Sequence, residues 1–396
     1  MGARGQAFVA VHACCWYPCD RMGRRLVIVV DSAAIGGVAR IVANLALGLR
    51  ARNWEVHTVF PSWADAQFLA WCDSLQLRPE FSTALRAISS GGPYEAIKAQ
   101  LALRSFLVHM RADVVNFHYS GSIVSAKDVL AARMARVPRC VASVHLVARW
   151  HEQRPLRRTM TGVAARLADR VIAESHAAAE GQYQAGVPHD RVTVIANGVR
   201  APKNPPTTAE VRQQLGIEPQ AYVVGAVARL APVKRLQDLI EAVGILRRSN
   251  IPVMALIAGD GPDRASLERL AVACAPGAVR FLGHADDPSP VYVASDVVAL
   301  PSELEGQPMS PIEAAFFAKP CVATAIGGTS EIIVDGVTGF LVPVGAPGRI
   351  AERLSDLYHD RPLAERMGAA AFARASAEFS LDAMVSRYER VLTTGG

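Results

Sequence analysis

Two glutamates eight positions apart, Glu305 and Glu313, stand where an apolar strand pattern gives way to a helix pattern. Between them lie Gly306, whose missing side chain lets the backbone approach a ligand, and Met309 and Ser310 near the helix start. Carboxylates accept hydrogen bonds from vicinal sugar hydroxyls, and amides at a helix start attract phosphate. The spacing therefore predicts a nucleoside or sugar site. The alternative is a loop acid followed by a solvated helix glutamate.

A pair of cations follows another strand pattern. Arg229 and Lys234 lie five positions apart in the loop after the apolar run 223–228. An arginine can grip a pyrophosphate with two hydrogen bonds, and a lysine can neutralise it as a point charge. Such a pair would stabilise a nucleoside diphosphate leaving group without a metal ion, and no Asp-x-Asp motif stands in a metal-binding context. The alternative is an exposed basic loop.

Weaker signals lie in the first half of the chain. Gly36 and Gly37 follow the first strand pattern and permit close approach to a phosphate or a sugar, but they lack the Gly-x-Gly-x-x-Gly fingerprint. A dehydrogenase is therefore disfavoured. His118 and His145 each end a strand pattern, and strand ends of one parallel sheet meet at one edge. Both are candidates for the same cleft, although a lone histidine of this kind is usually structural.

Alternating strands and helices must position these residues. Continuous apolar, β-branched runs predict buried parallel strands at 26–30, 56–60, 114–117, 141–145, 171–173 and 192–195, then at 223–228, 253–259, 279–282, 297–300 and 321–324. Helical spacing covers 38–52, 94–109, 122–135, 159–168, 236–249, 265–273, 310–317 and 381–392. This order predicts an α/β chain with two successive doubly wound, Rossmann-like domains.

The domain boundaries follow from where the patterning stops. Prolines at 202, 205 and 206 predict a linker at 201–208. We expect an N-terminal domain at 22–200, a C-terminal domain at 209–378 and a last helix within 379–396. Residues 1–21 read as an irregular leader, and Met22 is a candidate start.

Composition sets the broad class. With 396 residues, 51% hydrophobic and 20% charged, the chain has material for two cores, which excludes a disordered protein. Residues 1–200 carry 24 Lys and Arg against 14 Asp and Glu, whereas the remainder carries 18 against 22. The basic first half suits an anionic acceptor, a phosphate-bearing substrate or an anionic membrane surface. A solvated arginine-rich surface is the alternative.

Seven scattered cysteines do not form a disulfide framework, which predicts reduced thiols and a cytoplasmic location. Cys14, Cys15 and Cys19 cluster, but no second Cys or His pair stands at zinc-site spacing from them. We therefore expect no metal. No apolar run reaches the roughly 18 residues that span a bilayer.

In this order along the chain, these motifs resemble the retaining GT-B glycosyltransferases of family four. The resemblance covers about residues 25 to 392. It rests on Gly36-Gly37, His118, His145, Asn197-Gly198-Val199, Arg229 with Lys234, Ala258 to Pro262, Phe281-Leu282-Gly283, and the Glu305–Glu313 spacing. It implies two Rossmann-like domains that face each other across a cleft.

The resemblance also implies roles, with a nucleoside-diphosphate sugar as donor and no cofactor or nucleic-acid partner. Donor contacts would come from Gly37, Arg229, Lys234, His284, Glu305, Gly306, Met309, Ser310 and Glu313. Within this set the two cations would hold the pyrophosphate, Glu313 the ribose, and Glu305 with the backbone of 306–310 the transferred sugar. The implied catalytic group is His118, near the reaction centre, with Glu305, Arg229 and Lys234. The sugar would move with retention, the leaving phosphate accepting the proton of the acceptor.

Two departures from the family pattern leave the sugar open. Gln307-Pro308 replaces a frequent aromatic–Gly pair, and Arg235 replaces the usual glycine after Lys234. The acceptor is a glycan, a lipid-linked molecule or a small molecule. His145, Arg149 and Trp150 are candidates for its side of the cleft.

The segment 145–158, which mixes arginines, a tryptophan and aliphatic residues, suggests peripheral contact with an anionic membrane at its inner face. A solvated helix start is the alternative. Two other functions stay open: an inactive sugar-nucleotide-binding partner subunit, and a sugar-nucleotide epimerase on the same fold.

Overall fold

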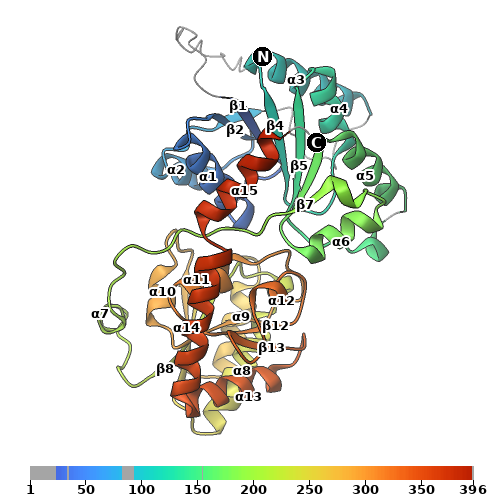
Figure 1. Cartoon of the computed structure of the whole chain (residues 1–396). Helices are drawn as coiled ribbons and strands as arrows, with labels where there is room; N and C mark the ends of the chain where they lie inside the picture. The colour runs from blue at the N-terminus through green and yellow to red at the C-terminus, as the bar shows by residue number, and fades with distance from the viewer. Residues whose placement is uncertain (1–23, 34, 83–92, 154, 395–396) are drawn as a thin grey trace, which may run out of the picture.

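The computed structural model describes residues 24–33, 35–82, 93–153 and 155–394. The expectations for the leader 1–21, for Met22 and for Cys14, Cys15 and Cys19 lie outside these residues. Two lobes are stacked one above the other in Figure 1, and each is a parallel sheet between layers of helices. This arrangement confirms the expected pair of doubly wound α/β domains.

The N-terminal lobe is built on a seven-stranded sheet in the order β3-β2-β1-β4-β5-β6-β7. Its strands are β1 (Arg25–Val30), β2 (Glu55–Pro61), β3 (Glu80–Ser82), β4 (Val114–Tyr119), β5 (Arg139–Val144), β6 (Arg170–Ala173) and β7 (Val192–Val194). The central strands β1, β4 and β5 are buried on both faces, which explains why their apolar residues do not alternate with exposed polar ones.

Helices cover the two faces of this sheet unequally. One face packs against α1 (Gly37–Arg50) and α2 (Ala66–Ser74), and alternate β1 residues such as Leu26 and Ile28 point to it. The other face, to which Val27 and Val29 point, packs against α3 (Pro93–Met110), α4 (Ala126–Met134), α5 (Pro155–Leu167) and α6 (His176–Gln184).

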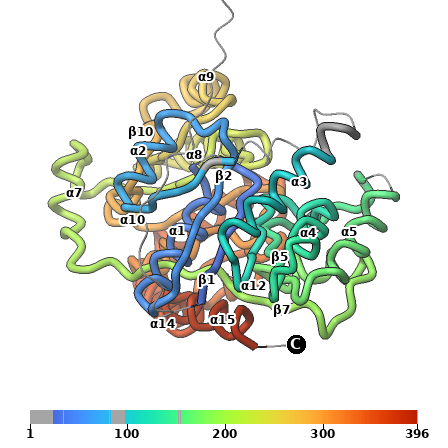
Figure 2. The backbone as a smooth tube through the Cα atoms, turned by 90° about the horizontal axis from the view of Figure 1, so that it is seen from above, coloured from blue at the N-terminus to red at the C-terminus, as the bar shows by residue number. Residues whose placement is uncertain are grey.

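The C-terminal lobe repeats the plan with a six-stranded sheet in the order β10-β9-β8-β11-β12-β13. The strands are β8 (Tyr222–Val227), β9 (Val253–Ala258), β10 (Val279–Gly283), β11 (Val297–Leu300), β12 (Cys321–Thr324) and β13 (Gly339–Val342). The helices are α7 (Thr208–Gln214), α8 (Leu236–Arg248), α9 (Arg264–Cys274), α10 (Ser289–Ala294), α11 (Met309–Phe316), α12 (Thr329–Ile332), α13 (Pro347–His359) and α14 (Arg361–Glu378). Seen from above in Figure 2, α7 stands at the periphery.

Two chain segments cross between the lobes, and they run side by side. Val199 forms a parallel bridge with Ser380, with hydrogen bonds of 2.9 Å from Val199 N to Phe379 O and from Leu381 N to Val199 O. After this crossing, α15 (Leu381–Thr393) packs on α1, with Tyr388 and Leu392 buried in the N-terminal core. Among the described residues, no helix has the length and apolar character needed to cross a bilayer.

The structure also corrects details of the sequence patterns. Strands β3 and β13 were not predicted, because both are short edge strands and β13 begins at a glycine. Helix α4 begins at Ala126, four residues later than its apolar spacing suggested, and α5 begins at Pro155, four residues earlier. A proline is favoured in the first turn of a helix, and that signal was missed at Pro155.

Candidate functional site

A cavity of about 480 Å³ lies between the two lobes. Its C-terminal wall follows the carboxyl ends of β8, β9 and β11 and the start of α11. The N-terminal lobe contributes the start of α1 and the ends of β5 and β6. The lining includes all nine predicted donor residues: Gly37, Arg229, Lys234, His284, Glu305, Gly306, Met309, Ser310 and Glu313. Its volume lies in the ordinary range for a small-molecule site.

The two predicted cations reach this cavity from the loop after β8. Arg229 is exposed, while Lys234 donates from Nζ to Glu305 Oε1 at 2.6 Å. The loop is held close to the end of β9, because Gly259 has φ of +140° and a Cβ there would overlap the carbonyl oxygen of Ala228. Gly259 thus lets the backbone just before Arg229 pack against the end of β9, and a bulkier residue could not replace it without strain.

Arg235, one of the departures from the family pattern, adopts a left-handed conformation with φ of +47° at the start of α8. A glycine takes up this conformation without steric penalty, which explains the usual choice. The arginine is held there by two hydrogen bonds to the buried carboxylate of Asp238, at 2.8 and 3.0 Å. It therefore serves the loop rather than the cavity.

Glu305 and Gly306 face the opposite lobe at very short range. A Cβ on Gly306 would overlap Glu174 Oε1 and approach His145 O, so the lobes meet closely here. The Gln307 amide already donates to Glu174 Oε1 at 2.8 Å. Of the backbone predicted to hold the sugar, the Gln307 amide is therefore committed elsewhere.

Glu313 lies on α11, and its carboxylate is partnered from two sides. Tyr292 donates its hydroxyl to Oε2 at 2.5 Å, and Arg40 Nη1 of the opposite lobe lies 3.7 Å from Oε1. Burial raises the pKa of Glu313 despite these partners. Arg40 also donates to the carbonyl oxygen of Asp286 at 3.0 Å, beside His284, whose Nε2 lies 3.2 Å from Asp286 Oδ1.

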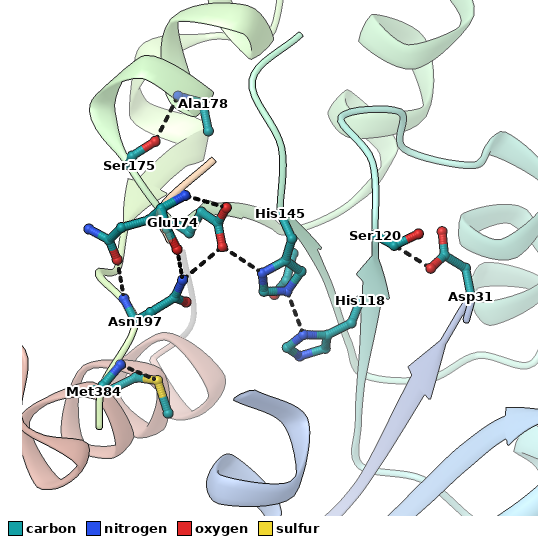
Figure 3. A network of polar contacts seen from close by, with 12 residues as sticks. Asp31, His118, Ser120, His145, Glu174, Ser175, Ala178, Asn197 and Met384 are labelled. Atoms are coloured by element: carbon teal, nitrogen blue, oxygen red, sulfur yellow. Dashed lines mark hydrogen bonds and ion pairs between the residues drawn. The ribbon is translucent and has the colours of Figure 1, made fainter. Parts of the chain in front are cut away.

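The structure corrects the position predicted for His118. This residue is 0% exposed and does not line the cavity, whereas His145 does. His118 Nδ1 lies 2.9 Å from His145 Nε2, so the first histidine stands behind the second (Figure 3). β4 is more central than β5, and Tyr388 of α15 stacks on His118 from the other side. Burial lowers the pKa of His118 well below its usual value, which keeps the ring neutral.

Two residues predicted for the acceptor side do not line the cavity either. Trp150 is buried, and its indole donates to Gly181 O at 2.7 Å. Arg149 donates to the carbonyl oxygen of Glu303 at 3.1 Å, a contact between the lobes. The chain just before the short 3-10 turn Trp150–Glu152 lies against α6, since a Cβ on Gly181 would overlap Ala148.

Among the cavity residues to which sequence reasoning gave no role are Arg40, Glu174 and Asn197. Arg40 follows the glycine pair by three positions, one helical turn into α1, which was a usable signal. Glu174 directly follows the end of β6, a place where parallel sheets carry functional groups. Asn197 was noted for its motif but given no role. Within the described ranges, no group of three or more His, Cys, Asp or Glu side chains is arranged to hold a metal ion.

Both lobes match known protein families. Residues 35–201 match the family described as Glycosyltransferase Family 4, and residues 207–374 match Glycosyl transferases group 1. The D-inositol 3-phosphate glycosyltransferase of Corynebacterium diphtheriae is 30% identical over 351 residues, 79% of this chain and 81% of that protein. The N-acetyl-alpha-D-glucosaminyl L-malate synthase of Bacillus anthracis is 28% identical over 183 residues, and this match covers 46% of the chain and only 48% of that protein.

Solved structures show the same fold. Anabaena Alr3699/HepE in complex with UDP superposes with a TM-score of 0.80 at 23% identity, covering 93% of this chain and 99% of that one. Sucrose-phosphate synthase from Thermosynechococcus elongatus gives a TM-score of 0.76 at 18% identity, with 93% and 98% covered.

Proposed function

The chain belongs to the family 4 glycosyltransferases, and from that premise we propose that it moves a sugar from a uridine-diphosphate sugar to an acceptor with retention of anomeric configuration. One observation carries the proposal. A single cavity between two Rossmann-like lobes collects Arg229, Lys234, Glu305 and Glu313 around the start of α11. A nucleoside diphosphate sugar needs cations, helix amides and carboxylates together in this way.

The donor groups divide along the cavity. Arg229 and Lys234 neutralise the pyrophosphate, and Glu313 accepts hydrogen bonds from the ribose hydroxyls. Glu305 holds the transferred sugar. Lys234, which bonds to the Glu305 carboxylate, therefore sits between that carboxylate and the phosphate. Gly37, with open space around its Cα, faces the phosphates from the other lobe. His145, which lines the cavity where His118 does not, takes the position beside the reaction centre.

Retention through a protein nucleophile would need an uncommitted carboxylate at the sugar. Glu305 is held by Lys234, and Glu174 accepts hydrogen bonds from three donors. We therefore propose front-face attack, in which the acceptor oxygen bonds to the anomeric carbon as the bond to phosphate breaks. The departing phosphate takes the acceptor proton, and Arg229 and Lys234 stabilise its charge.

Uridine is proposed because the similar Anabaena structure holds UDP. Calorimetric titration of UDP, GDP and ADP tests the base, and Glu313→Ala tests the ribose contact. A nucleotide at 100 times its Kd adds roughly 2.7 kcal/mol to the stability of the state that binds it. We expect UDP to bind tightest and the variant to lose most of that affinity. Equal binding of all three would reject the uridine proposal.

Anomeric outcome is tested separately. Time-resolved proton NMR of the sugar released from an α-linked UDP-sugar shows whether the α anomer appears before mutarotation. An initial β anomer would reject retention. Nucleotide binding without any sugar release or transfer would instead favour the inactive partner subunit, and isomerised UDP-sugar would favour an epimerase.

We further propose that the N-terminal lobe docks on an anionic membrane through one face, at the cytoplasmic side. Helices α3, α4 and α5 lie side by side in Figures 1 and 2. They expose a run of large apolar side chains: Ile97, Leu101, Val108, Leu130, Met134, Leu156, Met160, Val163 and Leu167. The same helices carry seven Lys or Arg, at 98, 104, 127, 133, 157, 158 and 166, against Glu95 and Asp128. An apolar face with a basic rim suits acidic lipid headgroups.

Vesicle sedimentation tests this surface. Leu156, 69% exposed, and Met160 are replaced together by serine, with the comparably exposed Val272→Ser of the other lobe, 74% exposed, as control. We expect the control and the wild type to sediment with phosphatidylglycerol vesicles and the double variant to stay in solution. Equal sedimentation of all three, or none by the wild type, would reject the membrane proposal. For the compartment, Cys72, Cys140, Cys274 and Cys321 are unpaired thiols, as suits a reducing environment.

A further inference from the structure

Glu174 is a buried carboxylate to which the proposed chemistry gives no part. It follows β6 directly, is 5% exposed, and lies at the boundary between the lobes. Three donors reach it: His145 Nδ1 at 3.0 Å, the Asn197 side-chain amide at 2.9 Å and the Gln307 backbone amide at 2.8 Å. Figure 3 shows the carboxylate at the centre of these bonds. A buried carboxylate that accepts from several donors is held in one orientation.

The hydrogen bonds on the other side of His145 have a fixed direction. The Asn116 side-chain amide donates to His118 Nε2 at 2.8 Å, so the proton of the neutral His118 ring lies on Nδ1. His118 Nδ1 then donates to His145 Nε2 at 2.9 Å. A neutral His145 must therefore carry its proton on Nδ1 and donate it to Glu174. The chain of bonds selects one tautomer of the cavity histidine.

The third donor belongs to the opposite lobe. Gln307 donates its backbone amide to Glu174, and its side-chain oxygen accepts from Asn197 N at 2.5 Å. Gly306, one residue earlier, has no room for a Cβ beside Glu174 Oε1. The carboxylate thus reaches its full set of donors only when the 306–307 loop is docked against the N-terminal lobe. Gln307, which departs from the family pattern, makes both of these bonds, and its carbonyl oxygen also accepts from the Asn197 side-chain amide at 2.9 Å.

We propose that Glu174 is a positioning residue that fixes the tautomer and orientation of His145. Through the bond from Gln307, it makes both depend on docking of the 306–307 loop against the N-terminal lobe. The inference rests on the proposed function, since it assigns His145 to the reaction centre. Approach of the C-terminal lobe completes the hydrogen bonds of Glu174, and Glu174 then holds the His145 ring against the cavity. When the 306–307 loop is not docked, Glu174 lacks the hydrogen bond from Gln307 and holds the His145 ring less firmly.

Glu174→Gln is the diagnostic change because it preserves shape and removes an acceptor. If the amide oxygen faces His145 and Asn197, its NH₂ group opposes the Gln307 N–H. If the amide is turned, the NH₂ group opposes His145 Nδ1–H and drives that proton to Nε2, against His118. Either arrangement places two donors face to face. Glu331→Gln is the matched control, because Glu331 also joins the lobes, accepting from His176 N and Ala177 N at 2.9 Å, but does not touch His145.

Two measurements on the full chain test the proposal. Long-range ¹H–¹⁵N correlation of histidine-labelled protein without nucleotide reports the tautomers, and His145→Gln identifies the His145 signals. We expect the Nδ1–H tautomer in the wild type and in Glu331→Gln, and a loss or mixing of tautomers in Glu174→Gln. Steady-state transfer should show kcat lowered by about tenfold or more in Glu174→Gln, with UDP Kd within about threefold of wild type.

The outcomes separate the possible failures. An unchanged His145 tautomer in Glu174→Gln, or equal loss of kcat in both variants, would overturn the positioning role. A tautomer change in a protein that transfers no sugar would support the hydrogen-bond inference and reject the proposed function instead. If Glu174→Gln does not fold, Glu174→Asp keeps the carboxyl group but withdraws it by one methylene. It should weaken the tautomer preference and lower kcat, and wild-type values of both would equally overturn the proposal.

Discussion

The ion pair between Lys234 and Glu305 joins the loop after β8 to the loop before α11, and it offers a test of how these loops are held. Lys234→Met keeps the aliphatic stem and removes the ammonium group 2.6 Å from Glu305 Oε1. At an effective dielectric constant of about 20, two charges at that separation attract by roughly 6 kcal/mol. Desolvation of both ions offsets most of this attraction, so the net contribution of the pair is small.

Lys234→Met alone nevertheless lowers the free energy of unfolding, because it leaves a carboxylate without its counter-ion. Removing one partner of a fully buried pair costs about 3–5 kcal/mol. The Lys234 side chain is 23% exposed and that of Glu305 is 9% exposed, so water reaches the site from one side. We therefore expect Lys234→Met to lower the free energy of unfolding by about 2 kcal/mol. Glu305→Gln should cost about 1 kcal/mol, since the remaining ammonium can turn to solvent.

A double-mutant cycle isolates the pair. The double variant should be no less stable than Glu305→Gln alone, which corresponds to a coupling of about 2 kcal/mol. Calorimetry is the suitable assay, because every tryptophan lies before residue 151 and fluorescence would report mainly the N-terminal lobe. For a lobe of this size, Lys234→Met should lower its Tm by about 4–8 °C. Additive effects, with a coupling under about 0.5 kcal/mol, would refute this reasoning.

Two further predictions concern the cavity walls. Burial raises the pKa of Glu313, so its contribution to stability is present below the unfolded pKa and is lost as pH rises through the folded pKa. UDP binding needs the ionised carboxylate, so titration calorimetry should show affinity falling as pH drops below that raised pKa, and Glu313→Gln should bind weakly without this pH dependence. Gly306→Ala should lower stability by about 2 kcal/mol or more, because the new Cβ overlaps Glu174 Oε1, whereas Gly37→Ala should change it by under about 0.5 kcal/mol and weaken UDP binding. Equal melting temperatures for the two alanine variants would contradict the close approach of the lobes.

Much of the fold could be predicted because the central strands are buried on both faces. Runs such as Leu26 to Val30 and Val253 to Ala258 have no polar alternation, and this feature distinguishes parallel strands under helices. The edge strands β3 and β13 could not be found in the same way, although the edge strands β7 and β10 were predicted. Glu80–Ser82 has only three residues, and too few positions remain to establish a period.

The site was predictable on its C-terminal side and less so on the other. The predicted residues form two pairs that are close in sequence, Arg229 with Lys234 and Glu305 with Glu313. The spacing within each pair therefore carried information about one loop or one helix. Sequence spacing does not tell whether a residue at the end of a strand is buried or reaches the cavity. His118 and His145 look equivalent in sequence, yet Tyr388 of α15 stacks on the first, which is 0% exposed, while the second is 6% exposed and lines the cavity.

Contacts between the lobes were invisible to pattern reasoning. Glu174 and Gln307 are 133 positions apart, and neither is unusual for its local element. Arg40 likewise meets Glu313 only because the lobes face each other. Such pairs depend on how two independent sheets are oriented, which local periodicity does not encode.

The return of α15 to the N-terminal lobe has a consequence for how the molecule is made. Tyr388 and Leu392 fill the core formed by β1 and α1, yet a ribosome delivers them more than 330 residues later. The lobe that is synthesised first cannot close its core until α15 has also been synthesised. The second lobe, complete by the end of α14, can finish folding earlier. Synthesis of α15 is thus the step that completes the N-terminal core. A nascent chain stalled before residue 381 would expose the surface of α1 to chaperones.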